Sequence, residues 1–254
     1  MSDILLKKES QVLKILINRP HKKNALSMPM YQHMAMAIEQ AKEDNEIRAI
    51  LIASTADDFT AGNDLADFAD FSEHEQIGDT VRFMNALMHC PLPVVAKVQG
   101  LAVGIGTTML LHCDLVYCAD NSRFSLPFIN LGLVPEYASS FLLPKLAGHA
   151  KAAQWLMLGE SFNAEDAKAF GMVNQVFNLD QLNIEVEKVL AKLVAKPRQA
   201  MALTKALMKS NLEEVNLHMN EELDFFIEQL RTPAAKEAFA AFLQKRQPDP
   251  DIYN

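Results

Sequence analysis

Apolar and polar positions follow two different periods through about residue 195. Short apolar runs, typical of buried strands, alternate with longer segments that carry apolar residues at helical spacing. Such alternation predicts an α/β architecture with parallel strands. A hairpin is predicted at 4–6 and 12–17, and further strands at 49–54, 94–98, 115–118 and 172–177. Helices are predicted at 30–43, at 72–90 and from a glycine-rich turn at 100–106 to about residue 112.

The sequence beyond about residue 195 has helical patterns and no convincing strand. Pro197 opens this stretch, and Thr232 with Pro233 is a favourable N-cap and first-turn pair for a last helix. The preceding helix carries an apolar stripe of Leu223, Phe226, Ile227 and Leu230. These helices need a partner surface, either the core of this chain or that of a neighbouring subunit. We therefore predict a core unit at 1–195 and a C-terminal helical region at 196–254.

Composition narrows the function classes. The chain has 254 residues, of which 50% are hydrophobic and 22% charged, and this excludes a disordered protein. A net charge of −8 argues against nucleic-acid binding. No apolar run is long enough to span a membrane, and no signal peptide is visible. Three cysteines do not make a secreted disulfide framework, so we expect a cytoplasmic protein. No His and Cys spacing matches a zinc site, and no metal is expected.

Glycines cluster where the chain leaves two predicted strands. Of nine glycines, Gly62, Gly100, Gly104 and Gly106 lie in the turns after strands 49–54 and 94–98. Glycine permits unusual backbone angles and close approach, and the first turn of a helix leaves its N–H groups unpaired. Two such turns facing each other would form an oxyanion hole. A single turn of this kind is equally compatible with a purely structural role.

Five segments, in order, resemble the landmarks of the crotonase, or enoyl-CoA hydratase/isomerase, superfamily. They are 18–26 (NRPHKKNAL), 59–65 (FTAGNDL), 99–106 (QGLAVGIG) with Cys113 and Asp114, 124–133 (FSLPFINLGL) and 170–174 (FGMVN). The resemblance runs from about residue 4 to 246. It implies an α/β spiral of repeated ββα units with a C-terminal α-helical trimerisation region, assembled as a homotrimer or hexamer.

The resemblance also implies where an acyl-CoA would bind. The backbone N–H groups of Asn63 and Ile105 would hold the thioester oxygen, although the family often has glycine in place of Ile105. Residues 66–80 are expected to form part of the acyl pocket. No separate cofactor is implied, because CoA is part of the substrate. The lysines among the implied contacts are equally well explained as solvated surface cations. Substrate contacts are implied for Lys22, Lys23, Ala25, Ala61, Gly62, Asp64, Leu65, Gly104, Thr108, Phe128 and Lys245.

The position of the acids selects the reaction. The two glutamates of enoyl-CoA hydratases correspond here to Thr108 and Phe128, neither of which is a useful base. The segment around Glu136 instead resembles that of Δ3,Δ2-enoyl-CoA isomerases, in which a single glutamate carries the chemistry. Without that resemblance, Glu136 is equally read as a solvated residue in the first turn of the following helix. A following helix would lower its pKa and apolar neighbours would raise it, and the sequence leaves the balance open.

The resulting expectation is an isomerase that moves an enoyl-CoA double bond between C3 and C2, as in fatty-acid oxidation. Two alternatives stay open. One is another crotonase-type enzyme, such as a hydratase or an isomerase of dienoyl or ring-derived thioesters. The other is a non-catalytic subunit that binds acyl-CoA.

Overall fold

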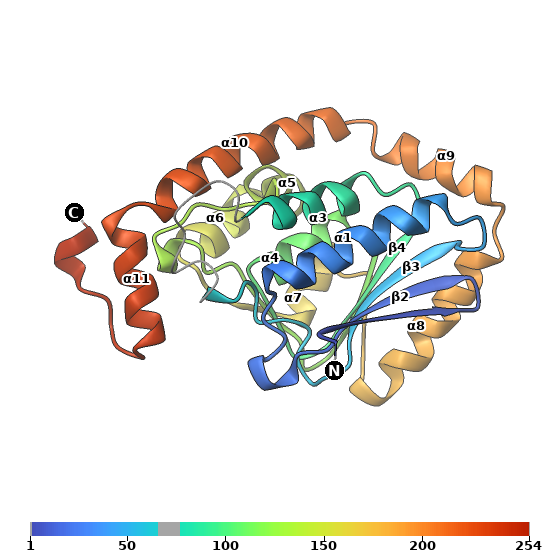
Figure 1. The fold of residues 1–254 in the computed structure, drawn as a ribbon, viewed down its shortest axis with the longest axis horizontal. Helices are drawn as coiled ribbons and strands as arrows, with labels where there is room; N and C mark the ends of the chain where they lie inside the picture. The colour runs from blue at the N-terminus through green and yellow to red at the C-terminus, as the bar shows by residue number, and fades with distance from the viewer. Residues whose placement is uncertain (1, 66–76, 254) are drawn as a thin grey trace.

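Two sheets organise the chain, whose computed structural model describes residues 2–65 and 77–253 (Figure 1). The larger sheet is six-stranded and parallel, apart from the β1–β2 hairpin. In spatial order it contains β1 (Ile4–Glu9), β2 (Val12–Ile17), β3 (Ala49–Ser54), β4 (Val94–Val98), β6 (Leu115–Ala119) and β9 (Gln175–Phe177). The smaller sheet contains β5 (Leu101–Val103), β7 (Arg123–Ser125) and β8 (Phe162–Asn163).

Helices cover both faces of the larger sheet, as its continuous apolar strands require. In β3, Ile50 and Ile52 point to the main core beneath α1 (Met28–Glu43) and α3 (Gly78–Met88). The alternate residue Leu51 points to the opposite face, where α8 (Leu179–Val194) packs. The remaining helices of this unit are η1 (Pro20–Lys22), α4 (Ile105–Thr108), η3 (Met109–His112), η4 (Ile129–Leu131), α5 (Ser139–Ala147), α6 (His149–Met157) and α7 (Ala164–Ala169).

The chain winds as a spiral in which each turn visits the larger sheet, then the smaller sheet, then a helix. β4, β5 and α4 form one such turn, and β6, β7 and the segment leading to α5 form the next. Two isolated bridges, Leu26 to Asn63 and Thr60 to Ala102, continue the same path through the earlier turns. The points at which successive turns enter their helices are therefore stacked side by side. This stacking brings together residues that are far apart in sequence.

The C-terminal helices wrap around this spiral. They are α9 (Arg198–Met208), α10 (Leu212–Leu230), α11 (Pro233–Leu243) and η5 (Pro250–Tyr253). α10 runs from α9 to α11 and packs against α5 (Figure 1). Phe226, Ile227 and Leu230 are buried in the same core as the sheets, so their partner surface is this chain's own core. The start of α11 approaches Gly132, whose absent Cβ would lie 2.9 Å from the Ala235 nitrogen.

The predicted elements are largely confirmed, with differences at short elements. The predicted turn at 100–106 contains β5, and the apolar helix after it is one α-helical turn followed by the 3₁₀ helix η3. The predicted strand at 172–177 is confirmed only as β9, because Met172 and Val173 N–H groups bond to the Ala167 carbonyl at the end of α7. β7 and β8 were not predicted, since strands of three and two residues have no readable period. The predicted helix at 72–90 is described from Gly78 to Met88, and its earlier residues, with most of segment 66–80, lie outside the described residues.

Other expectations concern what the described part of the chain contains. None of its helices has the length and hydropathy needed to cross a membrane. No group of three His, Cys, Asp or Glu side chains in it is arranged to hold a metal ion. Cys90, Cys113 and Cys118 are all free.

Candidate active site

The two glycine-bearing turns lie directly against each other. The Thr60 N–H donates to the Leu101 carbonyl at 2.9 Å, and the Val103 N–H donates to the Thr60 carbonyl at 3.1 Å. A Cβ on Gly106 would lie 2.4 Å from Thr60 Cγ2, and one on Gly62 would lie 2.8 Å from the Val103 oxygen. Glycine is therefore required at both positions by close approach, as well as by the φ of +89° at Gly62.

In the part of the chain that the structure describes, the N–H groups of Asn63 and Ile105 have no hydrogen-bond partner. Ile105 begins α4 after Gly104, and the first N–H groups of a helix have no partner within it. The Asn63 N–H has no hydrogen bond within residues 2–65 and 77–253, while the N–H of Asp64 next to it donates to the Leu26 carbonyl at 2.9 Å. The buried Tyr31 hydroxyl donates to Asn63 Oδ1 and fixes that residue. These are the two donors that the sequence predicted.

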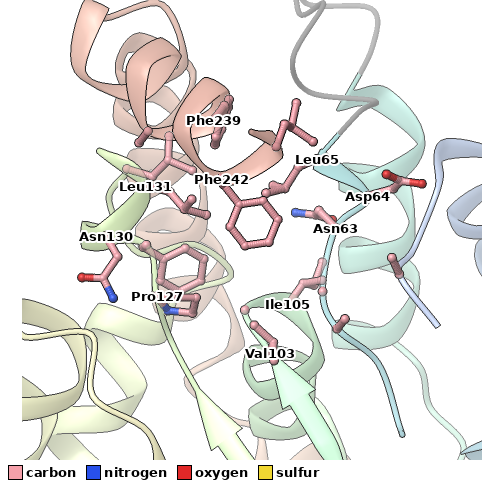
Figure 2. Close-up of a pocket in the computed structure, with 18 of the residues that line it drawn as sticks. Asn63, Asp64, Leu65, Val103, Ile105, Pro127, Asn130, Leu131, Phe239 and Phe242 are labelled. Carbon is pink, nitrogen blue, oxygen red and sulfur yellow. The ribbon is translucent and has the colours of Figure 1, made fainter. Parts of the chain in front are cut away.

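A cavity of about 590 Å³ opens beside these turns. Figure 2 shows Asn63, Leu65 and Ile105 on one side of it and Leu131 and Phe242 on the other. Phe226 of α10 and Phe239 and Phe242 of α11 also line it, and the sequence analysis did not assign them to the site. Of the predicted site residues, the following line the cavity: Lys22, Lys23, Ala25, Ala61, Gly62, Asn63, Asp64, Leu65, Gly104, Ile105 and Phe128.

Three predicted residues lie elsewhere. Lys245 is exposed and does not line the cavity, whereas its neighbour Arg246 does. Thr108 and Glu136 are buried and hydrogen-bonded to each other at the C-terminal end of α4. Thr108 lies one helical turn after the cavity-lining Ile105.

The charged side chains at the cavity differ in their ion-pair partners. The Asp64 carboxylate points away from the cavity (Figure 2) and pairs with Arg19 Nη1 at 2.7 Å. Arg19 was not predicted as a site residue, although it stands in the first resembling segment. The cations Lys22, Lys23 and Arg246 belong to the lining, and Arg246 pairs with Glu237. The cavity is therefore lined mainly by apolar side chains, together with the cations Lys22, Lys23 and Arg246.

Glu136 is a buried carboxyl group that does not itself line the cavity. Its side chain is 3% exposed, and Thr108 Oγ1 donates to its Oε1 at 2.5 Å. Its Oε2 has no hydrogen-bond partner among the described residues. Burial raises the pKa of Glu136 to about 8, with a further increase from the nearby Glu222 and an opposing effect from the Thr108 hydroxyl. Burial therefore outweighs the Thr108 hydrogen bond, and the net effect on the pKa of Glu136 is an increase.

A strained turn directs Glu136 inward. Tyr137 and Ala138 have φ of +61° and +56°. Residues other than glycine rarely adopt such angles, and each residue that does so costs about 1–3 kcal/mol of stability. The Tyr137 hydroxyl donates to the Met84 carbonyl at 2.7 Å. His112 stacks on the Tyr137 ring at 3.8 Å and its Nε2 donates to the Tyr137 carbonyl at 2.8 Å. Burial lowers the pKa of His112 to about 3, so this donor is neutral.

The arrangement suits proton transfer beside a polarised carbonyl. Two convergent N–H groups can stabilise a developing oxyanion, and a carboxyl group of raised pKa can carry a proton. Phe128, which the sequence analysis compared with a hydratase glutamate, is 5% exposed and contributes an apolar ring to the cavity.

Comparison with known proteins agrees with this geometry. Residues 7–251 match the sequence model of the family described as Enoyl-CoA hydratase/isomerase. Rat enoyl-CoA delta isomerase 2 is 37% identical over 225 residues, which are 86% of this chain and 57% of the rat protein. The chain thus spans little more than half of that relative. Escherichia coli 2,3-dehydroadipyl-CoA hydratase is 32% identical over 252 residues, or 98% of each chain.

A solved structure extends the likeness to the fold. The crystal structure of an enoyl-CoA hydratase/isomerase from Pseudoalteromonas atlantica T6c superposes with a TM-score of 0.92 at 39% sequence identity. The superposition covers 98% of this chain and 99% of that one. The architecture, the two glycine turns and the matched sequence lead to one assignment: the chain belongs to the enoyl-CoA hydratase/isomerase family, the crotonase superfamily.

Proposed function

We propose that this protein is an enoyl-CoA isomerase that moves a double bond between C3 and C2 of an acyl-CoA. The observation that carries the proposal is Glu136, a buried carboxyl group with one oxygen that has no partner among the described residues. Its hydrogen bond to Thr108 places it at the end of the short helix that Ile105 begins. By the resemblance, Thr108 and Phe128 stand at the hydratase positions. Isomerisation needs one base, whereas addition of water uses two acids in this family.

The thioester oxygen binds between the N–H groups of Asn63 and Ile105. These donors stabilise the negative charge that develops when the C2 proton leaves, and one such donor typically contributes about 3–4 kcal/mol. The Glu136 carboxylate takes the C2 proton and a dienolate forms. The same carboxyl group then delivers that proton to C4, and the double bond finishes at C2.

The properties of Glu136 support this single-base mechanism. A pKa of about 8 makes its carboxylate a stronger base than an exposed glutamate, which favours removal of a weakly acidic carbon-bound proton. Burial keeps the captured proton from exchanging with water before it reaches C4. Lys22, Lys23 and Arg246 at the cavity would face the CoA phosphates.

The direct test is a spectroscopic assay with a trans-3-enoyl-CoA. Wild-type protein should produce the absorbance of the conjugated 2-enoyl thioester without any coupling enzyme. Glu136→Gln should lower kcat by about 10²–10⁴-fold while CoA-ester binding persists. Glu213→Gln, which makes the same change on the exposed first turn of α10, is the matched control.

Other outcomes identify the alternatives. Formation of a 3-hydroxyacyl-CoA from a 2-enoyl-CoA, with no conversion of a 3-enoyl-CoA, would indicate a hydratase, as some relatives are named. Saturable binding of acyl-CoA with no turnover of 3-enoyl, 2-enoyl or dienoyl thioesters would indicate a non-catalytic subunit. Either result contradicts the isomerase proposal.

A further inference from the structure

A second buried carboxyl group, Glu222 of α10, lies next to the turn that carries Glu136. Its side chain is 7% exposed, in the middle of the apolar face that includes Met219 and Phe226. It belongs to none of the sequence motifs of the site. A buried glutamate without an arginine or lysine partner is rare and costly, and its presence calls for a physical reason.

Glu222 caps the N-terminus of α5. The N-cap residue of α5 is Ala138, which has no side chain able to accept a hydrogen bond. Glu222 Oε1 supplies the missing acceptor from another helix, with the Ser140 N–H at 2.8 Å and the Ser140 hydroxyl at 2.5 Å. The backbone N–H groups of Ala138 and Ser139 further favour its charged form. The cap therefore ties α10 to the residues that follow Glu136 directly.

Unpartnered oxygens are concentrated at this same place. Within the described parts of the chain, three buried side-chain oxygens have no hydrogen-bond partner: Glu136 Oε2, Ser139 Oγ and Glu222 Oε2. Unpaired buried polar atoms are few in folded proteins and are often associated with function. All three belong to the turn at Glu136, the start of α5 or the side chain that caps it.

Donors are divided unequally between the two carboxyl groups. Glu222 has the Ser140 hydroxyl and the start of α5, while Glu136 has only the Thr108 hydroxyl. Burial raises the pKa of Glu222, and the hydrogen bonds from Ser140 and the start of α5 act against that increase. Negative charge is therefore better stabilised on Glu222 and the proton on Glu136. We infer that Glu222 is a positioning residue, which holds the turn that carries Glu136 and places a negative charge beside its carboxyl group.

Other groups near Glu136 do not supply such a charge. From α4 it is faced by the uncharged Thr108 hydroxyl. The adjacent Tyr137 phenol is kept protonated by burial, which raises its pKa, and His112 from η3 is neutral. Among the described residues, Glu222 is the group whose charge raises the pKa of Glu136.

The inference rests on the proposed role of Glu136 as the base. Its consequence is that the negative charge of Glu222 helps to keep the pKa of Glu136 raised. The test is an NMR titration of Glu136 in protein labelled with ¹³C at the side-chain carboxyl carbon of glutamate. The Glu136 signal is identified as the one that is missing in Glu136→Gln. In Glu222→Gln the midpoint should fall below about 8, because the neighbouring negative charge is gone. Glu221→Gln makes the same change at the next, exposed position of α10 and should leave the midpoint unchanged.

Turnover gives a second readout. The pH at which kcat/KM for a trans-3-enoyl-CoA rises should move down with the midpoint in Glu222→Gln, and should stay in place in Glu221→Gln. A purely structural role for Glu222 would lower the amount of active enzyme without moving this pH. An unchanged Glu136 midpoint in folded Glu222→Gln would overturn the inference.

If Glu222→Gln does not fold, a milder variant still allows the inference to be tested. Ser140→Ala removes one donor from Glu222 and keeps the carboxyl group itself. Glu222 should then titrate at higher pH and Glu136 at lower pH, and movement of both in the same direction contradicts the inference. These titrations need no substrate, so a shift of the midpoint in a protein without isomerase activity would support the role of Glu222 and count against the proposed function alone.

Discussion

Thr108 acts on Glu136 in the opposite direction to burial. Its hydroxyl donates to Glu136 Oε1 at 2.5 Å, and a donor to the carboxylate favours the ionised form. Thr108, which the resemblance aligns with a hydratase glutamate, thus serves as the hydrogen-bond partner of the proposed base. The sequence analysis placed Thr108 among the substrate contacts, and that role stays a prediction.

Removal of this donor should shift the pH dependence of turnover upwards. In wild-type protein kcat/KM should rise with pH through about 8, because the carboxylate form of Glu136 is the active one. A hydrogen bond to a charged group contributes roughly 1.5–3 kcal/mol, so Thr108→Val should raise this pH by about one to two units. At pH 7 the loss of kcat/KM should be about ten- to hundredfold.

The control for this experiment is the next residue of α4. The Thr107 hydroxyl is equally buried but donates to the Ala102 carbonyl at 2.6 Å, away from Glu136. Thr107→Val is therefore expected to cost stability and leave the pH of the rise in place. A pH profile of Thr108→Val that matches that of Thr107→Val would contradict the role given to Thr108.

At the scale of elements, the oxyanion hole depends on how closely two turns of the spiral pack. The turn at Thr60 and the start of α4 are in van der Waals contact through Gly106 and the Thr60 methyl group. Neither turn contributes a functional side chain; each contributes a backbone N–H. Their separation should therefore control the rate more than the identity of Asn63 or Ile105 does.

Gly106→Ala should push these turns apart. Its new Cβ would meet Thr60 Cγ2 at 2.4 Å, and a displacement of about 1 Å in an active site can cost about 10²-fold in rate. Thr60→Ser removes that methyl group and keeps the hydroxyl, which donates to the Asn24 carbonyl at 2.7 Å. The double variant should recover most of the kcat lost in Gly106→Ala. Additive losses in a double-mutant cycle of kcat would show that the packing of the turns does not control the hole.

At the scale of the whole molecule, the site is expected to cost stability. Glu136 has a folded-state pKa of about 8, above its ordinary value of 4.5. Between these values the folded protein retains a proton that the unfolded chain releases, so the free energy of unfolding falls as pH rises, by roughly 1.4 kcal/mol per pH unit. This contribution is fully present below pH 4.5 and is lost as pH rises through about 8.

Glu136→Gln should remove this pH dependence. Urea unfolding should give similar free energies for variant and wild type near pH 5, and the variant should be more stable by several kcal/mol near pH 8. Glu213→Gln, at an exposed position of α10, should follow the wild type at both values. A stability difference between Glu136→Gln and wild type that is the same at pH 5 and pH 8 would refute the raised pKa.

The sequence by itself determined the α/β class, most strands and helices and the two glycine turns, because these depend on local periodicity and short motifs, whereas the role of Glu136 as the base stays a prediction. Asn63, Ile105 and Glu136 each occur within such a motif. Tertiary structure decided the rest. The partners of Glu136 come from residues 108 and 222, and the apolar wall of the cavity comes partly from α10 and α11. Burial and charge coupling depend on these distant contacts, which no local pattern encodes. One local sign was present: an acid at position 222, within the apolar face of a helix.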